Sequence, residues 1–363
     1  MSQGSGDTLV YVGAYTEVLP HVRGTAEGVS VYRLDAATGA FHHLATVGGV
    51  VNPSFVAVDR ARRRLFAVQE VGEYAGRPGG AVSAFAIGGG GHELALLGHQ
   101  PTHGAHPCHV TVDASGRWLL VANYSGGSVT VLPVGEDGAP GPAPAVVGHS
   151  GPHPHHDGPH PHSTLQAPGG HVLAPDCGLD RVYIYTLDAA TGALAPHAQP
   201  WAQEAPGSGP RHLALHPRGD VVYCINERDS TLTTFAHDAA AGTLRALQNI
   251  STLPAGFGGR NSTADVHVHP SGRFVYGSNR GHDSIAAFAV GADGTLTVLG
   301  HTPTGGRTPR NFMIDPSGTF LLAANQDSNT VVTFRIDQAT GALGEPLHVA
   351  EVPTPVCLCP VVW

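Results

Sequence analysis

The sequence contains no lysine, since all 19 of its basic residues are arginine. Schiff-base chemistry, pyridoxal phosphate attachment and lysine-containing phosphate loops are therefore excluded. Charged residues make up only 13% of the 363 residues, and the net charge is −9 with histidine neutral. Nucleic-acid binding needs a basic face, so we expect no nucleic-acid partner. A site for an anion must be built from arginine, histidine or backbone N–H groups.

Long apolar runs are also missing, and no stretch approaches the ~20 residues that span a membrane. The chain does not start with a charged segment followed by an apolar one. We therefore expect no secretory signal, no membrane partner and a cytoplasmic protein. The five cysteines are odd in number, which argues against a disulfide framework and favours buried thiols in a reducing compartment.

Glycine and proline are abundant, with 49 and 29 residues, and many of them lie in the turns of a repeated module. Each copy has an apolar stretch, a tight turn, a second apolar stretch, a third stretch rich in valine and threonine, and a fourth after a glycine turn. The copies lie about 50 residues apart, the length of one four-stranded propeller blade. They begin NPSFVAVD (52–59), HPCHVTVD (106–113), HPHSTLQA (160–167), GPRHLALH (209–216), TADVHVH (263–269) and TPRNFMID (308–315).

The two ends of the chain together form one more copy. Residues 8–15, TLVYVGAY, and the segment after them match the second to fourth strands of the module, and residues 354–360, TPVCLCP, match the first. We therefore predict an all-β fold, a seven-bladed β-propeller whose N-terminal blade is completed by the C-terminal strand. This closure removes exposed sheet edges. Residues 1–363 form a single domain in this interpretation.

Each blade should deliver side chains to one mouth of the central channel, because the start of strand one and the end of strand two share an edge. Few charges exist in the chain, so their concentration at this mouth indicates a functional site. The first predicted set opens strand one and contains Ser54, Cys108, His162, Arg211, Asp265 and Arg310. The second set ends strand two and contains Gln69, Glu70, Asn123, Tyr124, Asp176, Asn226, Glu227, Asn279, Arg280, Asn325 and Gln326.

Some of these segments have an alternative interpretation. The asparagines can cap the turn after strand two, as they do in many β proteins. The histidine-rich loop at 148–163 can bind a metal as a low-complexity segment, but its spacing matches no metal motif, so we expect no metal site. Arg260 either reaches the mouth or lies outside it. Three arginines at 62–64 lie in a turn on the opposite face, where we expect them to be solvated.

The stretches YVGAYTE (11–17), GPHPHS (158–163), INE (225–227), SNRGHDS (278–284) and TPVCL (354–358) resemble the seven-bladed-propeller lactonase family along nearly the whole chain. Its best-known bacterial members are 6-phosphogluconolactonases, and a fungal carboxy-cis,cis-muconate cyclase shares the fold. The resemblance implies that His162, Arg211, Glu227 and Arg280 are catalytic, without a metal or organic cofactor. The predicted substrate-binding residues are Glu70, His160, Asn226, Asp265, His267, Asn279, Arg310, Asn325 and Gln326.

We therefore expect a hydrolase of 6-phospho-D-glucono-1,5-lactone in the pentose phosphate pathway, with a small phosphorylated lactone as its partner. His162 or Glu227 would be the base, and Arg211 and Arg280 would bind the oxyanion or the phosphate. One alternative is a muconate-type cycloisomerase or a lactonase for an unphosphorylated sugar acid, since arginine binds carboxylate and phosphate alike. Another is a non-catalytic propeller that binds a protein, which the low aromatic content of 6% argues against.

Overall fold

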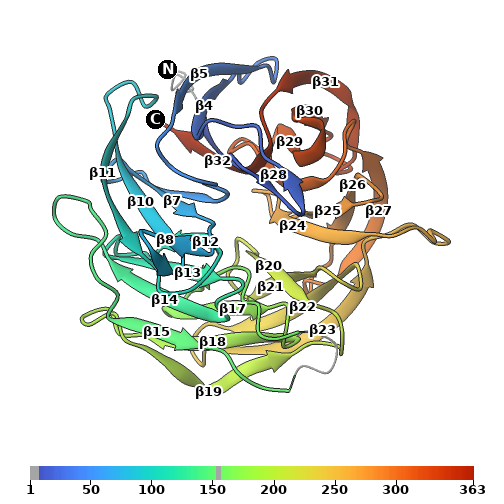
Figure 1. Ribbon diagram of the computed structural model, residues 1–363. Helices are drawn as coiled ribbons and strands as arrows, with labels where there is room; N and C mark the ends of the chain where they lie inside the picture. Colours follow the sequence, from blue (N-terminus) through green and yellow to red (C-terminus); the bar gives the residue numbers. More distant parts are fainter. Residues whose placement is uncertain (1–7, 153–156) are drawn as a thin grey trace, which may run out of the picture.

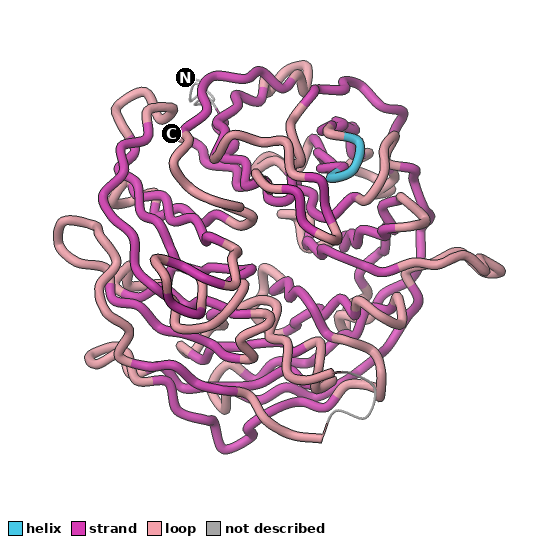
Figure 2. Tube along the Cα trace, in the orientation of Figure 1, coloured by secondary structure: helices cyan, strands magenta, loops and turns pink. Residues whose placement is uncertain are grey.

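The computed structural model describes residues 8–152 and 157–363, most of which lie in strands or in the turns between them. Seven four-stranded sheets are arranged in a ring, as Figure 1 shows. In these two ranges the one helix is a 3-10 turn, η1 (Gln326–Ser328), drawn in cyan in Figure 2. No helix in the described chain is long and apolar enough to cross a membrane. The predicted seven-bladed β-propeller is confirmed.

The first strands of the blades contact one another around the axis, and the fourth strands lie outside. One blade consists of β32 (Pro355–Val362), β1 (Thr8–Ala14), β4 (Val29–Leu34) and β5 (Phe41–Val47). The next two are β6 (Val56–Asp59), β7 (Arg64–Gln69), β10 (Ala81–Ile87) and β11 (Leu94–Pro101), then β12 (Pro107–Val112), β13 (Trp118–Asn123), β14 (Ser128–Pro133) and β15 (Ala145–Gly148).

The remaining four blades follow in chain order, each as four consecutive strands. They are β16 (Leu165–Gln166), β17 (His171–Asp176), β18 (Arg181–Leu187) and β19 (Leu194–Gln203); β20 (Pro210–Leu215), β21 (Val221–Asn226), β22 (Thr231–Asp238) and β23 (Thr243–Ser251); β24 (Ser262–Val268), β25 (Phe274–Arg280), β26 (Ser284–Val290) and β27 (Leu296–Pro303); β28 (Pro309–Ile314), β29 (Phe320–Asn325), β30 (Thr330–Ile336) and β31 (Leu343–Glu351). Two short ribbons lie outside the blades: β2 (Val18–Leu19) with β3 (Val22–Arg23), and β8 (Glu73–Tyr74) with β9 (Arg77–Pro78).

The ring closes through β32, the last strand of the chain, which pairs antiparallel with β1 from Thr8 opposite Val362 to Ala14 opposite Pro355. In Figure 1 the red C-terminal strand accordingly lies beside the blue N-terminal blade. This confirms the prediction that the C-terminal strand completes the N-terminal blade. Because the pairing joins the two ends of the described chain, every blade has a neighbour on both faces.

Neighbouring blades are held together by apolar side chains between their faces and by repeated hydrogen bonds. Tyr11 and Val31 of the first blade, for example, share a buried cluster with Leu65 and Phe85 of the second. Tyr11, Tyr223 and Tyr276 each donate a hydrogen bond to a glycine carbonyl in a turn of the following blade, at 2.6, 2.9 and 2.8 Å. These contacts fix each blade relative to the next, and thereby fix the walls of the channel.

Arg63 differs from the expectation that the arginines at 62–64 are only solvated. Its guanidinium lies 4.0 Å from the centre of the Trp363 ring, and its Nε donates to the Ile87 carbonyl at 3.2 Å. We expect Arg63→Ala to lower the free energy of unfolding by about 1–2 kcal/mol, because a cation–π contact and a hydrogen bond are lost, and to leave kcat unchanged. Chemical denaturation measures this, with the exposed Arg60→Ala of the same turn as control. Equal stability of the two variants would contradict the prediction.

Candidate active site

The first strands are bulged where they begin. In β12, β20 and β28 a proline pairs with the asparagine that ends the second strand, and the ladder then skips one residue. A β-bulge changes the direction of the side chain at the extra residue. We call the residues at this position the bulge ring: Cys108, Arg211 and Arg310, with Ser54, His162, Ala264 and Val356 at the matching positions of the other blades.

The bulge ring lies between two cavities on the channel. The upper cavity has a volume of about 850 Å³, and its lining includes Glu70, Cys108, Tyr124, His162, Glu227, Arg280 and Arg310. The lower cavity has a volume of about 540 Å³ and is lined by first-strand residues that include His109, His212, Asp265 and His267. A space of about 10 Å³ between them is bordered by Glu70, His162, Arg211, His212 and Arg310. Such a space holds one water at most, so a sugar can approach the bulge ring only from the upper cavity.

Two arginines and a glutamate form an ion cluster at the floor of the upper cavity. Arg211 Nε lies 3.0 Å and Arg280 Nη2 lies 3.3 Å from the same oxygen, Glu227 Oε2. Arg280 Nη2 also donates to the Thr263 carbonyl at 2.6 Å. Burial alone would raise the pKa of Glu227, but the positive charges of Arg280, Arg211 and Arg310 lower it to about 2. Glu227 is therefore a carboxylate at neutral pH that holds two guanidinium groups in place.

A second polar group links Glu70 to Arg310 through a tyrosine. The Tyr15 hydroxyl lies 3.0 Å from both carboxylate oxygens of Glu70, and the Ser54 hydroxyl also donates to Glu70. Arg310 Nη2 lies 3.4 Å from the Tyr15 oxygen. Burial would lower the pKa of Arg310, but Tyr15 and Glu70 raise it above its ordinary value, so Arg310 stays a cation. Arg280 and Arg310 on the floor and Arg211 beneath it thus each lie next to an acidic or hydroxyl partner.

His162 lies on the same floor and is 4% exposed. Its backbone N–H donates to the Pro175 carbonyl at 3.0 Å, which fixes the residue, and its Nδ1 is 3.8 Å from Cys108 Sγ. Burial, followed by the charge of Arg211, lowers the pKa of His162 well below 6.5. The imidazole is therefore neutral at pH 7 and can accept a proton.

The structure brings six of the residues predicted to be catalytic or substrate-binding to the wall of the upper cavity, namely Glu70, His162, Glu227, Arg280, Arg310 and Gln326, and it places Arg211 directly beneath them. His160 lies behind this wall instead. Its ring stacks on Tyr124 with 4.4 Å between centroids, and its Nε2 is 2.8 Å from Asp157 Oδ1. His160 therefore holds the cavity residue Tyr124 in position.

Asn226, Asn279 and Asn325 do not line the upper cavity, although the sequence predicts them at the mouth. All three are fully buried. Their amide groups donate to hydroxyl or carbonyl groups of neighbouring threonines at 2.9–3.1 Å. These contacts agree with the alternative in which the asparagines cap the turn after strand two, since each amide also reaches a hydroxyl on the far side of that turn.

Asp265 and His267 border the lower cavity, which corrects their predicted place at the upper mouth. The register of β24 gives the reason, because Thr263 pairs with Asn279 and the next pair is Val266 with Gly277. Ala264 therefore occupies the bulge position, and Asp265 is one residue beyond it. A shift of one residue along a strand turns the side chain to the other side.

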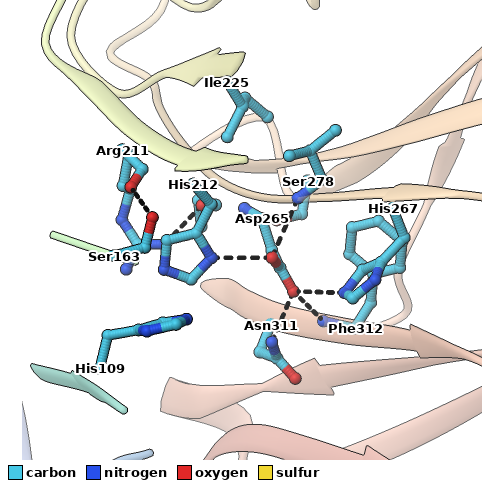
Figure 3. A network of polar contacts seen from close by, with 12 residues as sticks. His109, Ser163, Arg211, His212, Ile225, Asp265, His267, Ser278, Asn311 and Phe312 are labelled. Carbon is cyan, nitrogen blue, oxygen red and sulfur yellow. Dashed lines mark hydrogen bonds and ion pairs between the residues drawn. The ribbon is translucent and has the colours of Figure 1, made fainter. Parts of the chain in front are cut away.

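Asp265 joins three blades below the bulge ring, as Figure 3 shows. Its Oδ1 lies 2.9 Å from His212 Nδ1, its Oδ2 lies 2.9 Å from His267 Nε2, and Asn311 Nδ2 donates to Oδ2 at 2.5 Å. Burial would raise the pKa of Asp265, but His267 and His212 hold it well below its ordinary value. Asp265 is thus a buried anion whose carboxylate oxygens are hydrogen-bonded by its own blade and by the blades on both sides.

Sequence reasoning missed Tyr15 and His21. Tyr15 comes directly after β1 as Tyr124 comes directly after β13, so the repeat contained the signal for it. His21 lines the upper cavity from the ribbon of β2 and β3, which is an insertion outside the four-strand module. Arg260, for which the sequence left two alternatives, also lines the upper cavity.

No group of three or more histidine, cysteine, aspartate and glutamate residues is arranged to hold a metal ion within residues 8–152 and 157–363. The alternative metal site in the sequence lies in the histidine-rich loop at 148–163. Three of its histidines, His153, His155 and His156, lie outside the described residues.

The family model described as "Lactonase, 7-bladed beta-propeller" matches residues 9–360. The chain belongs to this lactonase family. The 6-phosphogluconolactonase of Bacillus subtilis (strain 168) is 35% identical over 353 residues, which cover 96% of this chain and 97% of that relative. The 6-phosphogluconolactonase of Pectobacterium carotovorum subsp. carotovorum (strain PC1) is 41% identical over 244 residues, 66% of this chain and 70% of the relative.

Among solved structures, the periplasmic gluconolactonase PpgL of Pseudomonas aeruginosa has a TM-score of 0.90 and 34% identity, and covers 98% of this chain and 99% of its own. These findings confirm the lactonase family that the sequence motifs indicate, and they support lactone hydrolysis as its activity. The four residues that the resemblance implies to be catalytic meet at one place, since His162, Glu227 and Arg280 line the upper cavity and Arg211 supports them.

Proposed function

We propose that this chain hydrolyses 6-phospho-D-glucono-1,5-lactone to 6-phosphogluconate, with His162 as the general base. The observation that carries the proposal is a neutral imidazole on a cavity floor that also holds the guanidinium groups of Arg280 and Arg310, with Arg211 directly beneath. The relatives named 6-phosphogluconolactonase support the phosphorylated substrate, one of them over 97% of its length. The gluconolactonase PpgL supports the unphosphorylated lactone as the second candidate.

In the proposed reaction a water molecule attacks the lactone carbonyl carbon while His162 takes one of its protons. The carbonyl oxygen becomes an oxyanion, and Arg280, supported by Arg211, donates hydrogen bonds to it. When the tetrahedral intermediate collapses, the bond between this carbon and the ring oxygen breaks. The protonated His162 returns the proton to that oxygen, which leaves as a hydroxyl. The carboxylic acid formed at C1 then releases its remaining proton to solvent and becomes the carboxylate of the product.

Glu227 is a poorer candidate for the base, because its negative charge already pairs with two guanidinium groups and its pKa is about 2. Proton transfer is most effective when the pKa of the base lies near the working pH. The same cations that lower the pKa of His162 also stabilise the hydroxide-like water beside it. Glu227 therefore has a positioning role in this proposal.

Acid release on two lactones, freshly prepared 6-phosphogluconolactone and glucono-1,5-lactone, tests the proposed function. The assay runs near pH 7 with EDTA, and the spontaneous opening of each lactone is subtracted. We expect acceleration of the phosphorylated lactone by the EDTA-treated protein. Acceleration of glucono-1,5-lactone alone would favour the second candidate, and acceleration of neither lactone would overturn the lactonase assignment.

The pH dependence of kcat/KM should identify the base. We expect kcat/KM on glucono-1,5-lactone to be level from pH 6.5 to 8 and to fall only below 6.5, because burial and Arg211 lower the pKa of His162. The unphosphorylated substrate is used since a phosphate monoester itself titrates with a pKa of about 6. If Glu227 were the base, the profile would stay level far below pH 5, since its pKa is about 2. A profile that falls already above pH 6.5 would contradict a lowered pKa at the base.

A further inference from the structure

Arg260 is a charged residue of the upper cavity that has no role in the proposed reaction. It lies in the loop between β23 and β24 and is exposed on the cavity wall. Within the described ranges its side chain makes no hydrogen bond or ion pair, whereas the guanidinium groups of Arg211, Arg280 and Arg310 all have partners. A guanidinium that faces a cavity without a partner is free to bind an anion.

The loop that carries Arg260 is held in place at both sides of this residue. The Phe257 ring packs edge-on against His282 with 4.8 Å between centroids. Asn261 donates to Ser230 Oγ at 2.9 Å and to Asn279 Oδ1 at 3.1 Å, and its own Oδ1 accepts the His282 N–H at 3.1 Å. Arg260 therefore starts from a fixed backbone position, which lowers the entropy lost when its side chain binds a ligand.

Gly281, directly after Arg280, allows the loop of Arg260 to pack closely against the end of β25. Its φ is +114°, and a Cβ at this position would lie 2.3 Å from the Arg260 carbonyl oxygen. Only glycine combines this backbone conformation with such a close approach. The end of β25 thus brings Arg280 on the floor and the Arg260 loop beside it into one wall of the cavity.

The charges of the cavity favour an anion near Arg260. Of the acidic residues on the wall, Glu227 pairs with Arg211 and Arg280, and Glu70 with Tyr15 and Ser54. Asp327 accepts hydrogen bonds from Thr308 Oγ1 at 2.5 Å and from Gln326 Nε2 at 2.8 Å. Among the arginines of this wall, Arg260 is the one whose side chain has no hydrogen-bond or ion-pair partner in the described part of the chain.

We propose that Arg260 binds the phosphate group of the substrate and thereby sets the preference for phosphorylated over unphosphorylated lactones; this rests on the proposed lactone hydrolysis at the cavity floor. In 6-phosphogluconolactone the phosphate is carried on C6, a substituent of C5, and C5 and the C1 carbonyl carbon flank the ring oxygen. A lactone with its carbonyl at His162 and Arg280 can therefore place its phosphate on the part of the cavity wall beside Arg280, where the loop of Arg260 lies. The planar guanidinium matches two phosphate oxygens.

The test compares kcat/KM on 6-phosphogluconolactone and on glucono-1,5-lactone for the wild type, Arg260→Gln and Arg245→Gln. Arg245 is an exposed residue of the outer strand β23, so its replacement removes the same charge away from the cavity. We expect Arg260→Gln to lose about 10- to 100-fold in kcat/KM on the phosphorylated lactone, the range of one charge-assisted contact, and nothing on the unphosphorylated one. Arg245→Gln should match the wild type on both.

A second readout separates binding from catalysis. Calorimetric titration with 6-phosphogluconate should give a larger dissociation constant for Arg260→Gln than for the wild type, by about the same factor as the loss in kcat/KM. The proposal is overturned if Arg260→Gln keeps the wild-type preference for the phosphorylated lactone, or if the wild type shows no such preference. Failure of the proposed function looks different, because then the wild type itself accelerates neither lactone.

Discussion

Replacing His162 by glutamine should lower kcat by about 10²–10⁴-fold, the range contributed by a general base. Glutamine keeps a polar side chain of similar length but cannot take a proton at neutral pH. The variant should fold, because the backbone N–H of residue 162 still donates to the Pro175 carbonyl at 3.0 Å. Lactone turnover, circular dichroism and thermal unfolding of the purified variant check the three statements.

The matched control is His42→Gln, which changes an exposed histidine on the outer strand β5 and should leave kcat unaltered. The slow residual reaction of His162→Gln should also lose the acid limb of the pH profile, since no group at position 162 titrates. If His162→Gln were folded and turned over lactone like the wild type, the base would have to be another group, and Glu227 would be the first to test.

The repeat in the sequence contains most of the information that builds the upper cavity. Strand-one openings and strand-two ends share an edge in every blade, which is why His162, Glu227 and Arg280 meet although they are far apart in the chain. The closing strand was predictable for the same reason, since residues 354–360 match a first strand and residues 8–15 a second. Because the strands of every blade pair in the same way, residues at equivalent positions of the repeat lie at equivalent positions around the channel.

Departures from regular strand pairing explain why the predicted position of Asp265 was wrong. The motif PRN around Arg310 and the motif PRH around Arg211 align with TAD at 263–265, so the residue that matches the arginines is Ala264 and not Asp265. Without a proline to mark the bulge in β24, the alignment slipped by one residue, and the side chain turned to the lower cavity. Side-chain hydrogen bonding is equally invisible in a repeat, which is why the sequence did not decide whether Asn226 faces the mouth or a turn.

Insertions outside the four-strand module are the third reason why the sequence did not predict the whole site. His21 and Arg260 reach the upper cavity from a ribbon and a loop whose paths depend on local contacts, such as those of Asn261 and Gly281. The shared chemistry of the site therefore follows from the repeat, whereas the groups that select among lactones are carried by segments that the repeat does not determine.

Arg280→Gln has the second large expected effect, a fall in kcat of about 10²–10³-fold, the cost of losing one donor to a developing oxyanion. Arg280 is better suited to this test than Arg211, because Arg211 is 2% exposed and its loss would leave a cavity inside the bulge ring. Loss of Arg280 also removes the largest of the charges that lower the pKa of Glu227. Slow turnover of the variant could therefore have two causes. One is the missing hydrogen-bond donor to the oxyanion, and the other is the negative charge of Glu227, which has lost one of its two guanidinium partners.

The double variant Arg280→Gln/Glu227→Gln separates these two causes. If the missing donor slows the reaction, the double variant should be as slow as Arg280→Gln, because glutamine at 227 restores no cation. If the unbalanced carboxylate slows it, the double variant should recover turnover, since the charge that opposes the oxyanion is gone. Arg245→Gln, with the same change on the outer strand β23, should behave like the wild type. We expect the first result, and recovery of turnover in the double variant would refute Arg280 as the oxyanion donor.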